Sequence, residues 1–386
     1  MEFSLEKREV RSKKLVFILP IISIVISMLL GAIILLACKV NPIMTYFYLV
    51  KGALGNKINL LNTIGKAIPL LLCGVGVGIA FKLKFWNIGA EGQYVWGVIG
   101  ITWVMLSGKW AELTAAGTYS NASWVMLFWA WVPDSLLLPI GILVGMLMGA
   151  LWAGIPAWLK AHWKVDETLS TLMLNYVVIK LAEYLYISKW KAPLGNMGTP
   201  DIPEAGFLTS FGYGGKLNTG LFMALAVVGI MYFILYKTRW GFELNMIGKN
   251  SKAARCQGVS IKRNIVIALL VSGAICGLAG AIDTAGITHK LTKGVDSGYG
   301  FTGIVIAWMA GLNPIISIFY ALLMAILRTG AFSLQIKMGL NSAMGDVLQG
   351  LILIPLLATN IFVDYRLVIK HYKKKIIDKV ACKEEE

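Results

Sequence analysis

The residues of this sequence that could do chemistry are isolated polar side chains set among long apolar runs. The stretch Asn87–Gln93 (NIGAEGQ) carries an amide, a carboxylate and a second amide between two hydrophobic segments. Asn175 lies deep in another apolar segment, and Glu183 and Asp283 lie nearer the ends of two more. Amides and carboxylates donate or accept hydrogen bonds without covalent chemistry. The pattern indicates hydrogen bonding, either within the protein or along a pathway, rather than catalysis.

The stretch Asn87–Gln93 has two interpretations, and the residues alone do not decide between them. In the first it is a tight turn, in which Gly89 and Gly92 allow positive φ and the polar groups satisfy exposed backbone. In the second, irregular Gly-rich backbone at the membrane edge lines a pathway or a moving contact. The second interpretation makes Asn87, Glu91 and Gln93 candidates for a substrate pathway.

The other polar residues also have two readings each. An amide at Asn175 facing lipid would be unfavourable, so it should face another helix or a cavity. Glu183 follows Lys180 by three residues on one helix face, so the two can pair. Charged groups within a membrane are costly and suggest function. The positions of Glu183 and Asp283 near helix ends are also explained by side chains that reach the membrane interface.

Several kinds of chemistry have no support in the sequence. It has no G-x-x-x-x-G-K-[ST] phosphate loop, so ATP is not bound in that way. The five cysteines and three histidines are scattered without metal spacing. We therefore predict no catalytic residue, no metal and no resident cofactor. The net charge of +16 does not indicate nucleic-acid binding, because the basic residues flank apolar runs as orientation signals do.

The elements that must position these residues are membrane-spanning helices. Hydrophobic residues make up 57% of the chain and charged residues 15%, and the apolar residues come in runs of about twenty, the length that a bilayer requires. We predict an all-α integral membrane protein with about ten spans. Their approximate bounds are Leu15–Ala37, Leu61–Phe81, Tyr94–Leu106, Leu136–Leu159, Leu169–Ser188, Leu221–Tyr236, Asn264–Ala285, Gly300–Gly311, Ile315–Phe332 and Ala343–Val363.

The distribution of Lys and Arg predicts the orientation of these spans. Five basic residues precede the first span, and seven lie in the tail. By the positive-inside rule both termini are cytoplasmic, which requires an even number of spans. The chain then divides into a cytoplasmic segment 1–14, a membrane domain 15–363 and a basic cytoplasmic tail 364–386. The outer segment 107–135 is Trp-rich, and its apolar part is too short to span, so we expect it to lie at the interface.

The polar stretch 237–263 is the centre of this arrangement. It carries seven Lys and Arg residues, and its helix-forming residues Ser251–Gln257 are stopped by Gly258. It is too short to be a domain. A short structured loop on the cytoplasmic face suggests a docking surface for a protein that supplies energy or a signal.

Four stretches of the chain carry a family resemblance: NIGAEGQ at 87–93, DETLSTLMLNYVV at 166–178, GFELNMIGKNSKAARCQGVS at 241–260 and SGYGFTGIVIAWMAGLNP at 297–314. Together they resemble the permease subunits of bacterial ABC importers. The branch they resemble carries simple sugars and nucleosides and works with a basic-membrane-protein-type lipoprotein receptor. Asp166 stands where the family often has asparagine. Lys252 stands where the E-A-A-x-x-x-G loop of importers has its glutamate.

The resemblance implies a type II-like permease fold in the bacterial inner membrane. It also implies a second permease subunit, a cytoplasmic ATPase that binds the ATP, and an extracytoplasmic binding lipoprotein. Residues 237–263 would be the loop that couples the ATPase to transport, with the family's motif carried by Gly241, Glu243, Gly248, Asn250, Ala253, Ala254 and Gly258. The implied function is uptake of nucleosides, purine nucleosides in particular.

Two alternatives stay open at this point. The same machinery could import a simple sugar or riboflavin, and the polar candidates cannot decide which. The chain could instead be an ion-coupled secondary transporter, but such proteins place coupling carboxylates near the membrane midplane. Here the acidic residues lie mostly near the ends of spans.

Overall fold

The computed structural model describes residues 2–7, 13–37, 39–115, 128–192, 198–211, 217–295, 298–338 and 365–370, with residues 347, 350–351 and 354–355. The predicted span Ala343–Val363 and the tail after residue 370 fall almost wholly outside these residues. The chain separates into two compact units, each considered by itself. One joins Met1–Thr45 with Ala343–Glu386, and the other is Tyr46–Ser342.

The first unit contains one long helix and a pair of strands. Helix α1, Lys13–Ala37, matches the predicted span Leu15–Ala37 and is 25 residues long. Strands β1 (Glu2–Lys7) and β2 (Tyr365–Lys370) pair antiparallel, with Glu2 opposite Lys370 and Lys7 opposite Tyr365. This pair of strands was not predicted, since sequence patterns within each segment do not reveal a partner at the far end of the chain.

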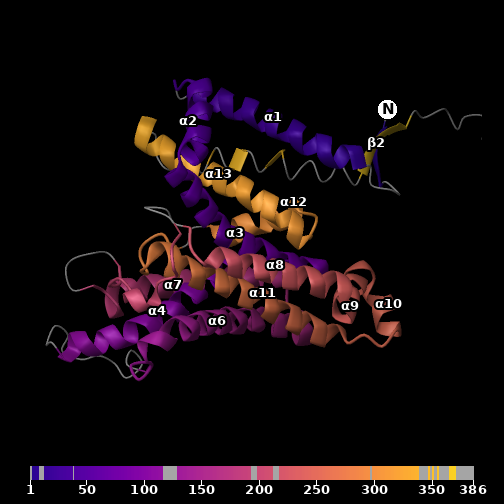
Figure 1. Ribbon diagram of the computed structural model, residues 1–386. Coiled ribbons are helices and arrows are strands. Elements are labelled where there is room, and N and C mark those ends of the chain that lie inside the picture. Colours follow the sequence, from indigo (N-terminus) through magenta and orange to yellow (C-terminus); the bar gives the residue numbers. More distant parts are fainter. Residues whose placement is uncertain are drawn as a thin grey trace, which may run out of the picture. The chain divides into compact units, whose positions relative to one another are not determined.

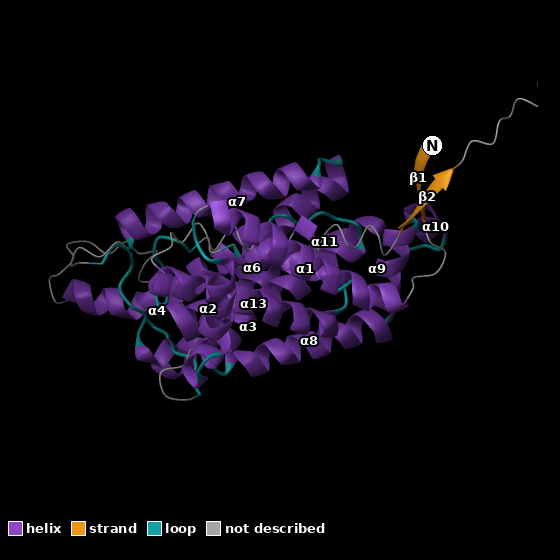
Figure 2. Ribbon diagram, turned by 90° about the horizontal axis from the view of Figure 1, so that it is seen from above, coloured by secondary structure: helices purple, strands orange, loops and turns teal. Residues whose placement is uncertain are grey.

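The second unit is a bundle of helices (Figures 1 and 2). Each segment between Leu61 and Phe332 that was predicted as a span is helical in the structure. The elements are α2 (Pro42–Leu54, begun in the first unit), α3 (Lys57–Lys82), α4 (Ala90–Ala115), α6 (Asp134–Trp163), α7 (Glu167–Tyr184), η1 (Leu185–Lys189), η2 (Glu204–Gly206), α8 (Gly220–Lys237), α9 (Arg239–Lys249), α10 (Ser251–Cys256), α11 (Ile261–Asp283), η3 (Thr284–Thr288), α12 (Tyr299–Met309) and α13 (Pro314–Met338).

Within the described residues, five helices are long and apolar enough to cross a membrane: α3, α6, α8, α11 continued by η3, and α13. A sixth is added if Val25–Ala37 and Pro42–Leu54 form one broken span. The predicted total of ten and the type II-like fold therefore stay predictions. Helix α2 was not predicted, because its 13 residues are too few to cross a bilayer.

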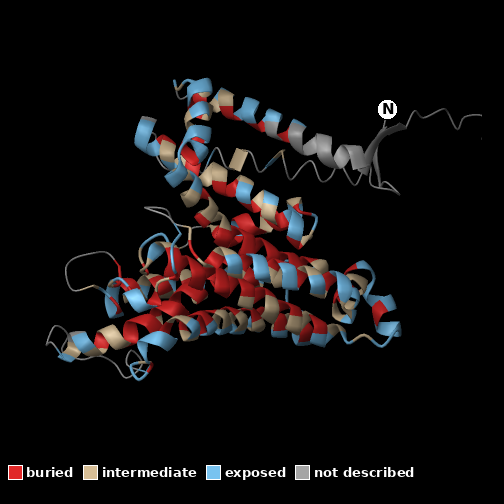
Figure 3. Ribbon diagram, viewed as in Figure 1, coloured by how far each residue is buried: buried red, intermediate tan, exposed pale blue. Residues whose placement is uncertain are grey.

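Helix α11 is the centre of the bundle and packs against α3, α4 and α6. Burial is concentrated along these helices (Figure 3). The contacts are close because small residues face each other. A Cβ atom added at Gly97 of α4 would collide with the backbone of Gly277 in α11, and one at Gly149 of α6 would collide with the backbone of Gly273. In lipid the hydrophobic effect does not drive helices together, so such close packing is a main source of helix association.

Replacing Gly97 by Ala tests this packing. We expect Gly97→Ala to lower the stability of the purified protein in detergent by about 1–3 kcal/mol, because the added methyl group forces α4 and α11 apart. Gly229→Ala in α8 is the matched control, since a Cβ there meets no atom within 4 Å and alanine favours a helix. Thermal unfolding measures both. Equal melting temperatures for the two variants would contradict the close contact.

Candidate functional site

The segment between α3 and α4 runs back into the bundle. It begins with a turn at Leu83 and Lys84, and its side chains alternate, with Leu83, Phe85 and Asn87 buried and Lys84 and Trp86 exposed. Asn87 meets Ser272, about three turns into α11. The polar residues therefore lie inside the bundle, deeper than the turn at the membrane edge that the sequence predicted. Helix α4 begins at Ala90, inside the bundle, rather than near Tyr94.

Two amides of this segment satisfy each other. The Nδ2 of Asn87 donates to Oε1 of Gln93 at 3.1 Å, and the Nε2 of Gln93 donates to Oδ1 of Asn87 at 3.0 Å. Asn87 also donates to the hydroxyl of Ser272 at 3.1 Å. Both amide side chains are fully buried. A reciprocal amide pair of this kind fixes the chain between α3 and α4 to α11.

The tight-turn interpretation, one of the two left open, expected a positive φ at Gly89 and Gly92. Neither has a left-handed backbone; in this segment Lys84 does, with φ of 57°. Both positions instead need glycine because a side chain would crowd α7. A Cβ at Gly89 would come within 3.1 Å of the Cβ of Thr171, and one at Gly92 within 2.7 Å of Oδ1 of Asn175. Both glycines therefore let α7 approach the start of α4.

Asn175 holds this approach in place. Its Oδ1 accepts a hydrogen bond from the backbone N–H of Gly92 at 2.8 Å, and its Nδ2 donates to the carbonyl of Ile88 at 2.8 Å. The side chain is 1% exposed. Of the two expected roles, a contact between helices or a contact with a cavity, these bonds support the first.

The carboxylate of Glu91 joins α4 to α12. Its Oε1 accepts from the N–H of Gly298 at 2.8 Å, and its Oε2 accepts from the N–H of Gly300 at 2.7 Å. The first N–H groups of a helix have no partner within the helix, and Gly298 at the N-cap of α12 has no side chain to cap them. Glu91 therefore caps α12 from another part of the chain. Its negative charge lies in the first turn of α4 as well, where a helix dipole favours it.

A second buried carboxylate, that of Asp283 in α11, contacts the next turn of α4. The hydroxyl of Tyr94 donates to Oδ2 of Asp283 at 2.8 Å, at the end of α11. The ring of Tyr94 contacts that of Tyr299, with centroids 5.4 Å apart, and the guanidinium of Arg328 lies 4.2 Å over Tyr299. Glu91 and four further ionisable side chains thus form one cluster at four helices: Tyr94, Asp283, Tyr299 and Arg328.

Arg328 was missed by the sequence analysis, although a signal for it exists. It is the single charged residue of the predicted span Ile315–Phe332, and a charge inside a membrane suggests function. Glu183, in contrast, does not join this cluster. Its side chain is 41% exposed on α7 and pairs with Lys180 at 2.6 Å, which confirms the predicted pair. Two predicted site residues, Glu91 and Asp283, belong to this cluster. Three others are buried amides on or bonded to the segment Asn87–Gln93: Asn87, Gln93 and Asn175.

The loop between α8 and α11 folds into two short helices at one end of the second unit (Figure 1). Two glycines let α9 pack tightly. A Cβ at Gly248 would collide with the carbonyl of Lys82 at the end of α3, and one at Gly241 with the carbonyl of Leu235 in α8. The carboxylate of Glu243 accepts hydrogen bonds from Arg239 at 3.0 Å and from Asn264 at 3.1 Å. Helix α9 is thus fixed to three neighbouring helices.

Helix α10 confirms the predicted helix stopped by Gly258. The Oδ1 of Asn250 caps its first turn by accepting from the N–H groups of Lys252 and Ala253, at 3.0 and 3.2 Å. Gly258 ends it with φ of 78°. Ala254 is buried and Ala253 is exposed. The seven basic residues of 237–263 are all exposed: Lys237, Arg239, Lys249, Lys252, Arg255, Lys262 and Arg263.

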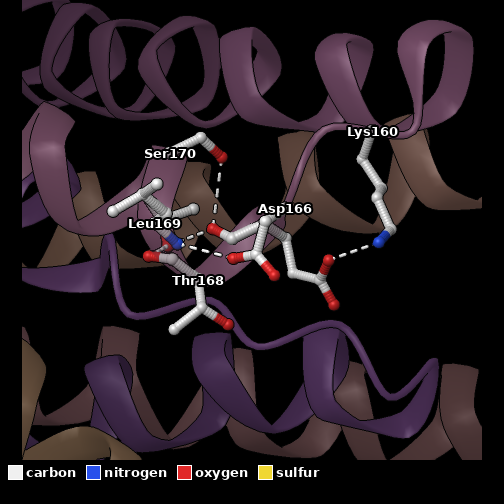
Figure 4. A network of polar contacts seen from close by, with 7 residues as sticks. Lys160, Asp166, Thr168, Leu169 and Ser170 are labelled. Carbon is white, nitrogen blue, oxygen red and sulfur yellow. Dashed lines mark hydrogen bonds and ion pairs between the residues drawn. The ribbon is translucent and has the colours of Figure 1, made fainter.

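The junction of α6 and α7 is also ordered by polar contacts (Figure 4). The Oδ1 of Asp166 accepts from the N–H of Leu169 at 2.8 Å and caps α7. Lys160 of α6 pairs with Glu167 of α7. Asparagine and aspartate cap helices equally well, so Asp166 keeps the capping function that an asparagine would have there.

These helices define a multi-pass membrane protein of the permease class. The chain belongs to the family described as branched-chain amino acid transport system / permease component, whose model matches residues 59–357. Its relatives are membrane subunits of ABC transporters and not enzymes, so the prediction of a transport subunit without catalysis is confirmed. No solved structure matches the chain.

Three relatives illustrate the range of the family. The chain is 30% identical to a glucose ABC transporter permease protein, TsgB13, of Haloferax volcanii, over 96% of this chain and 94% of that protein. It is 29% identical to the guanosine ABC transporter permease protein NupP of Bacillus subtilis, over 87% and 92%. It is 31% identical to the nucleoside ABC transporter permease protein NupB of Lactococcus lactis, over 81% and 83%.

Replacing Glu91 by Gln tests the cap on α12. Gln keeps one acceptor oxygen, and its amide N–H₂ would face a backbone N–H, so one buried bond is lost. We expect Glu91→Gln to lower the stability by about 1–3 kcal/mol, measured by thermal unfolding in detergent. Glu183→Gln is the control, because its exposed ion pair contributes about 0–1 kcal/mol. The cap is disproved if both variants unfold at the wild-type temperature.

Proposed function

We propose that this chain is a transmembrane subunit of an ABC importer that carries purine nucleosides into the cell with energy from a separate ATPase. Two of the three relatives described above are named for nucleoside or guanosine transport. The chain aligns with most of the length of both. The glucose relative supports the first alternative, a simple sugar as the solute of the same machinery.

The observation that carries the proposal is the exposed surface of α9 and α10. It is short, basic and fixed to the ends of α3 and α8 by Gly248 and Gly241. A protein that pushes on this surface would move α3 directly, because α9 lies against the carbonyl of Lys82 without an intervening side chain. A conformational equilibrium shifts only if the partner binds the two states with different free energies. Rigid attachment of the docking surface to the bundle allows this.

The proposed assembly contains three further proteins. The chain would pair with a second permease subunit, bind a cytoplasmic ABC ATPase through α9 and α10, and receive its solute from an extracytoplasmic binding lipoprotein. Relatives come in pairs within one organism, such as NupP with NupQ and NupB with NupC, which supports a heterodimer. Binding measurements on the partner lipoprotein would distinguish nucleosides from glucose or riboflavin.

The proposed location is the bacterial inner membrane with both termini in the cytoplasm. The pairing of β1 with β2 supports termini on one side of the membrane and hence an even number of spans between them. The basic residues before α1 and on the surface of α9 and α10 support the cytoplasm as that side.

Labelling of Cys256 tests the orientation. Cys256 is exposed on α10, whereas Cys73 and Cys276 are buried. In a variant with Cys38→Ser and Cys382→Ser, we expect a membrane-impermeant maleimide to label Cys256 only after the cells are opened. Labelling in intact cells would place α10 outside and would overturn the proposed ATPase contact.

Changes at Gly258 test the coupling. We expect Gly258→Pro to reduce guanosine uptake at least about tenfold at normal expression, because proline cannot adopt the left-handed backbone that ends α10. Gly258→Ala should have a smaller effect in the same direction, since a left-handed alanine costs roughly 1–2 kcal/mol.

The matched control is Gly294→Ala, in the loop before α12. Gly294 also has a positive φ, 88°, and no atom within 4 Å of an added Cβ, but it lies far from α10 in the chain. We expect wild-type uptake for this variant. Unchanged uptake in Gly258→Pro, with normal expression, would remove α10 from the mechanism.

A further inference from the structure

The charged face of α7 is a feature of the bundle that neither candidate site explains. Helix α7 and η1 continue one another from Glu167 to Lys189, over 18 and 5 residues. At the α-helical rise this run is about 34 Å long, enough to cross a hydrocarbon core of about 30 Å. Its midpoint is Val178, and Lys180 lies only about 3 Å further along. Lysine side chains reach the membrane surface from the ends of helices, so the charge of Lys180 stays inside the membrane.

Lys180 and Glu183 lie on the open side of α7. Their side chains are 76% and 41% exposed, and Nζ of Lys180 donates to Oε2 of Glu183 at 2.6 Å. Tyr176, Val177 and Tyr184 share this side and are 59%, 53% and 51% exposed. The buried side of the helix packs against α4 and α6. We call these five exposed residues the α7 face.

The open faces of α6 and α8 differ from the α7 face. Their exposed residues carry no charge between Leu136 and Trp158 of α6, nor between Phe222 and Tyr236 of α8. Both helices are long and apolar enough to cross a membrane, whereas α7 does not meet the same criterion. Uncharged apolar faces suit lipid. An ion pair near the middle of a bilayer instead faces protein or water, so the α7 face requires a cover other than lipid.

We propose that the α7 face is the contact surface for the second permease subunit. This inference rests on the proposed function and makes its partner more specific. Of the three further proteins in the proposed assembly, the second permease is the one whose folded part lies within the membrane, at the depth of Lys180. The apolar share of the face favours protein over water, because Tyr176, Val177 and Tyr184 lie one turn before and after Lys180.

The ion pair makes this contact selective. Polar side chains hydrogen-bond across helices in membranes, and a charge covered without a suitable partner is costly there. We expect the second permease to present a hydrogen-bonding side chain at the depth of Lys180 and Glu183, with apolar groups on both sides of it. A helix that is apolar at this depth would leave the pair covered but unmatched.

Bulky substitutions test the contact in the complete transporter: this chain, its partner permease, the ATPase and the binding lipoprotein, purified together in detergent. We expect Val177→Trp to weaken binding of the second permease about 5- to 150-fold, because extra volume in a packed contact is destabilising. The readout is the partner permease that stays bound per copy of this chain as the complex is diluted. Ile230→Trp is the matched control, since Ile230 is also β-branched and is 57% exposed on α8. We expect wild-type binding for it.

Photo-crosslinking identifies what covers the α7 face. The photo-reactive amino acid benzoylphenylalanine replaces Tyr184 in one variant and Phe233, which is 60% exposed on α8, in the control. Each replacement exchanges one exposed aromatic side chain for another, so the chain should fold in both. We expect an adduct with the second permease from position 184 and adducts with lipid alone from position 233.

Three outcomes overturn the inference. Adducts with lipid alone from position 184 would place the α7 face in the bilayer. An adduct with the lipoprotein or the ATPase would assign it to another partner. Full binding of the second permease by Val177→Trp, with uptake lost, would make the face a wall of the solute pathway.

Two other results concern the proposed function instead. An adduct with a second copy of this chain would keep the α7 face as the subunit contact and replace the heterodimer by a homodimer. If no ATPase co-purifies with the wild-type chain, the proposed function itself is wrong, and the crosslinks still report what covers α7.

Discussion

The carboxylate of Glu91 is the group on which the interior of the bundle depends. A charge buried away from water is stable only with hydrogen bonds to satisfy it. The start of α12 has the opposite need, because its first N–H groups lack partners. Glu91 brings the two together, with bonds to Gly298 and Gly300. Both α4 and α12 begin inside the bundle, and the N-terminal ends of both helices stabilise the charge of Glu91.

The segment that brings Glu91 to this position also connects the two candidate sites. It leaves α3 at Lys82, whose carbonyl lies against Gly248 of α9, and it ends at the amide pair of Asn87 and Gln93. It contains turns but no helix or strand, and its side chains alternate between buried and exposed. A displacement of α9 would reach the amide pair through a few residues of this chain. The surface of α9 and the buried polar residues are therefore joined by a short stretch of chain.

The sequence predicted the helices well and the contacts between them less well. Length and hydropathy were enough to place α3, α6 and α11, because a bilayer imposes both. The depth of Asn87 could not be predicted, since a Gly-rich polar stretch reads as a surface turn unless its partners are known. Two interpretations of Gly89 and Gly92 stayed open for the same reason. Their φ angles are ordinary, and only the presence of Thr171 and Asn175 explains them.

Arg328 shows a different limit. Its depth was available from the sequence, but an isolated arginine has many explanations until the ring beneath it is seen. The capping residues of the loop, by contrast, were local signals. Asn250 and Gly258 bound a helix of six residues whose position follows from those two types alone. Local geometry was therefore predictable, whereas contacts such as that of Glu91 with Gly298 were not.

The pairing of β1 with β2 has a consequence for biosynthesis. Glu2 leaves the ribosome almost first, and its partner Lys370 follows nearly the whole length of the chain later. At ordinary rates of translation the first strand waits on the order of tens of seconds for the second. The two strands can thus pair only after all the residues between them have been made, so this contact forms late in synthesis compared with contacts inside the helical bundle.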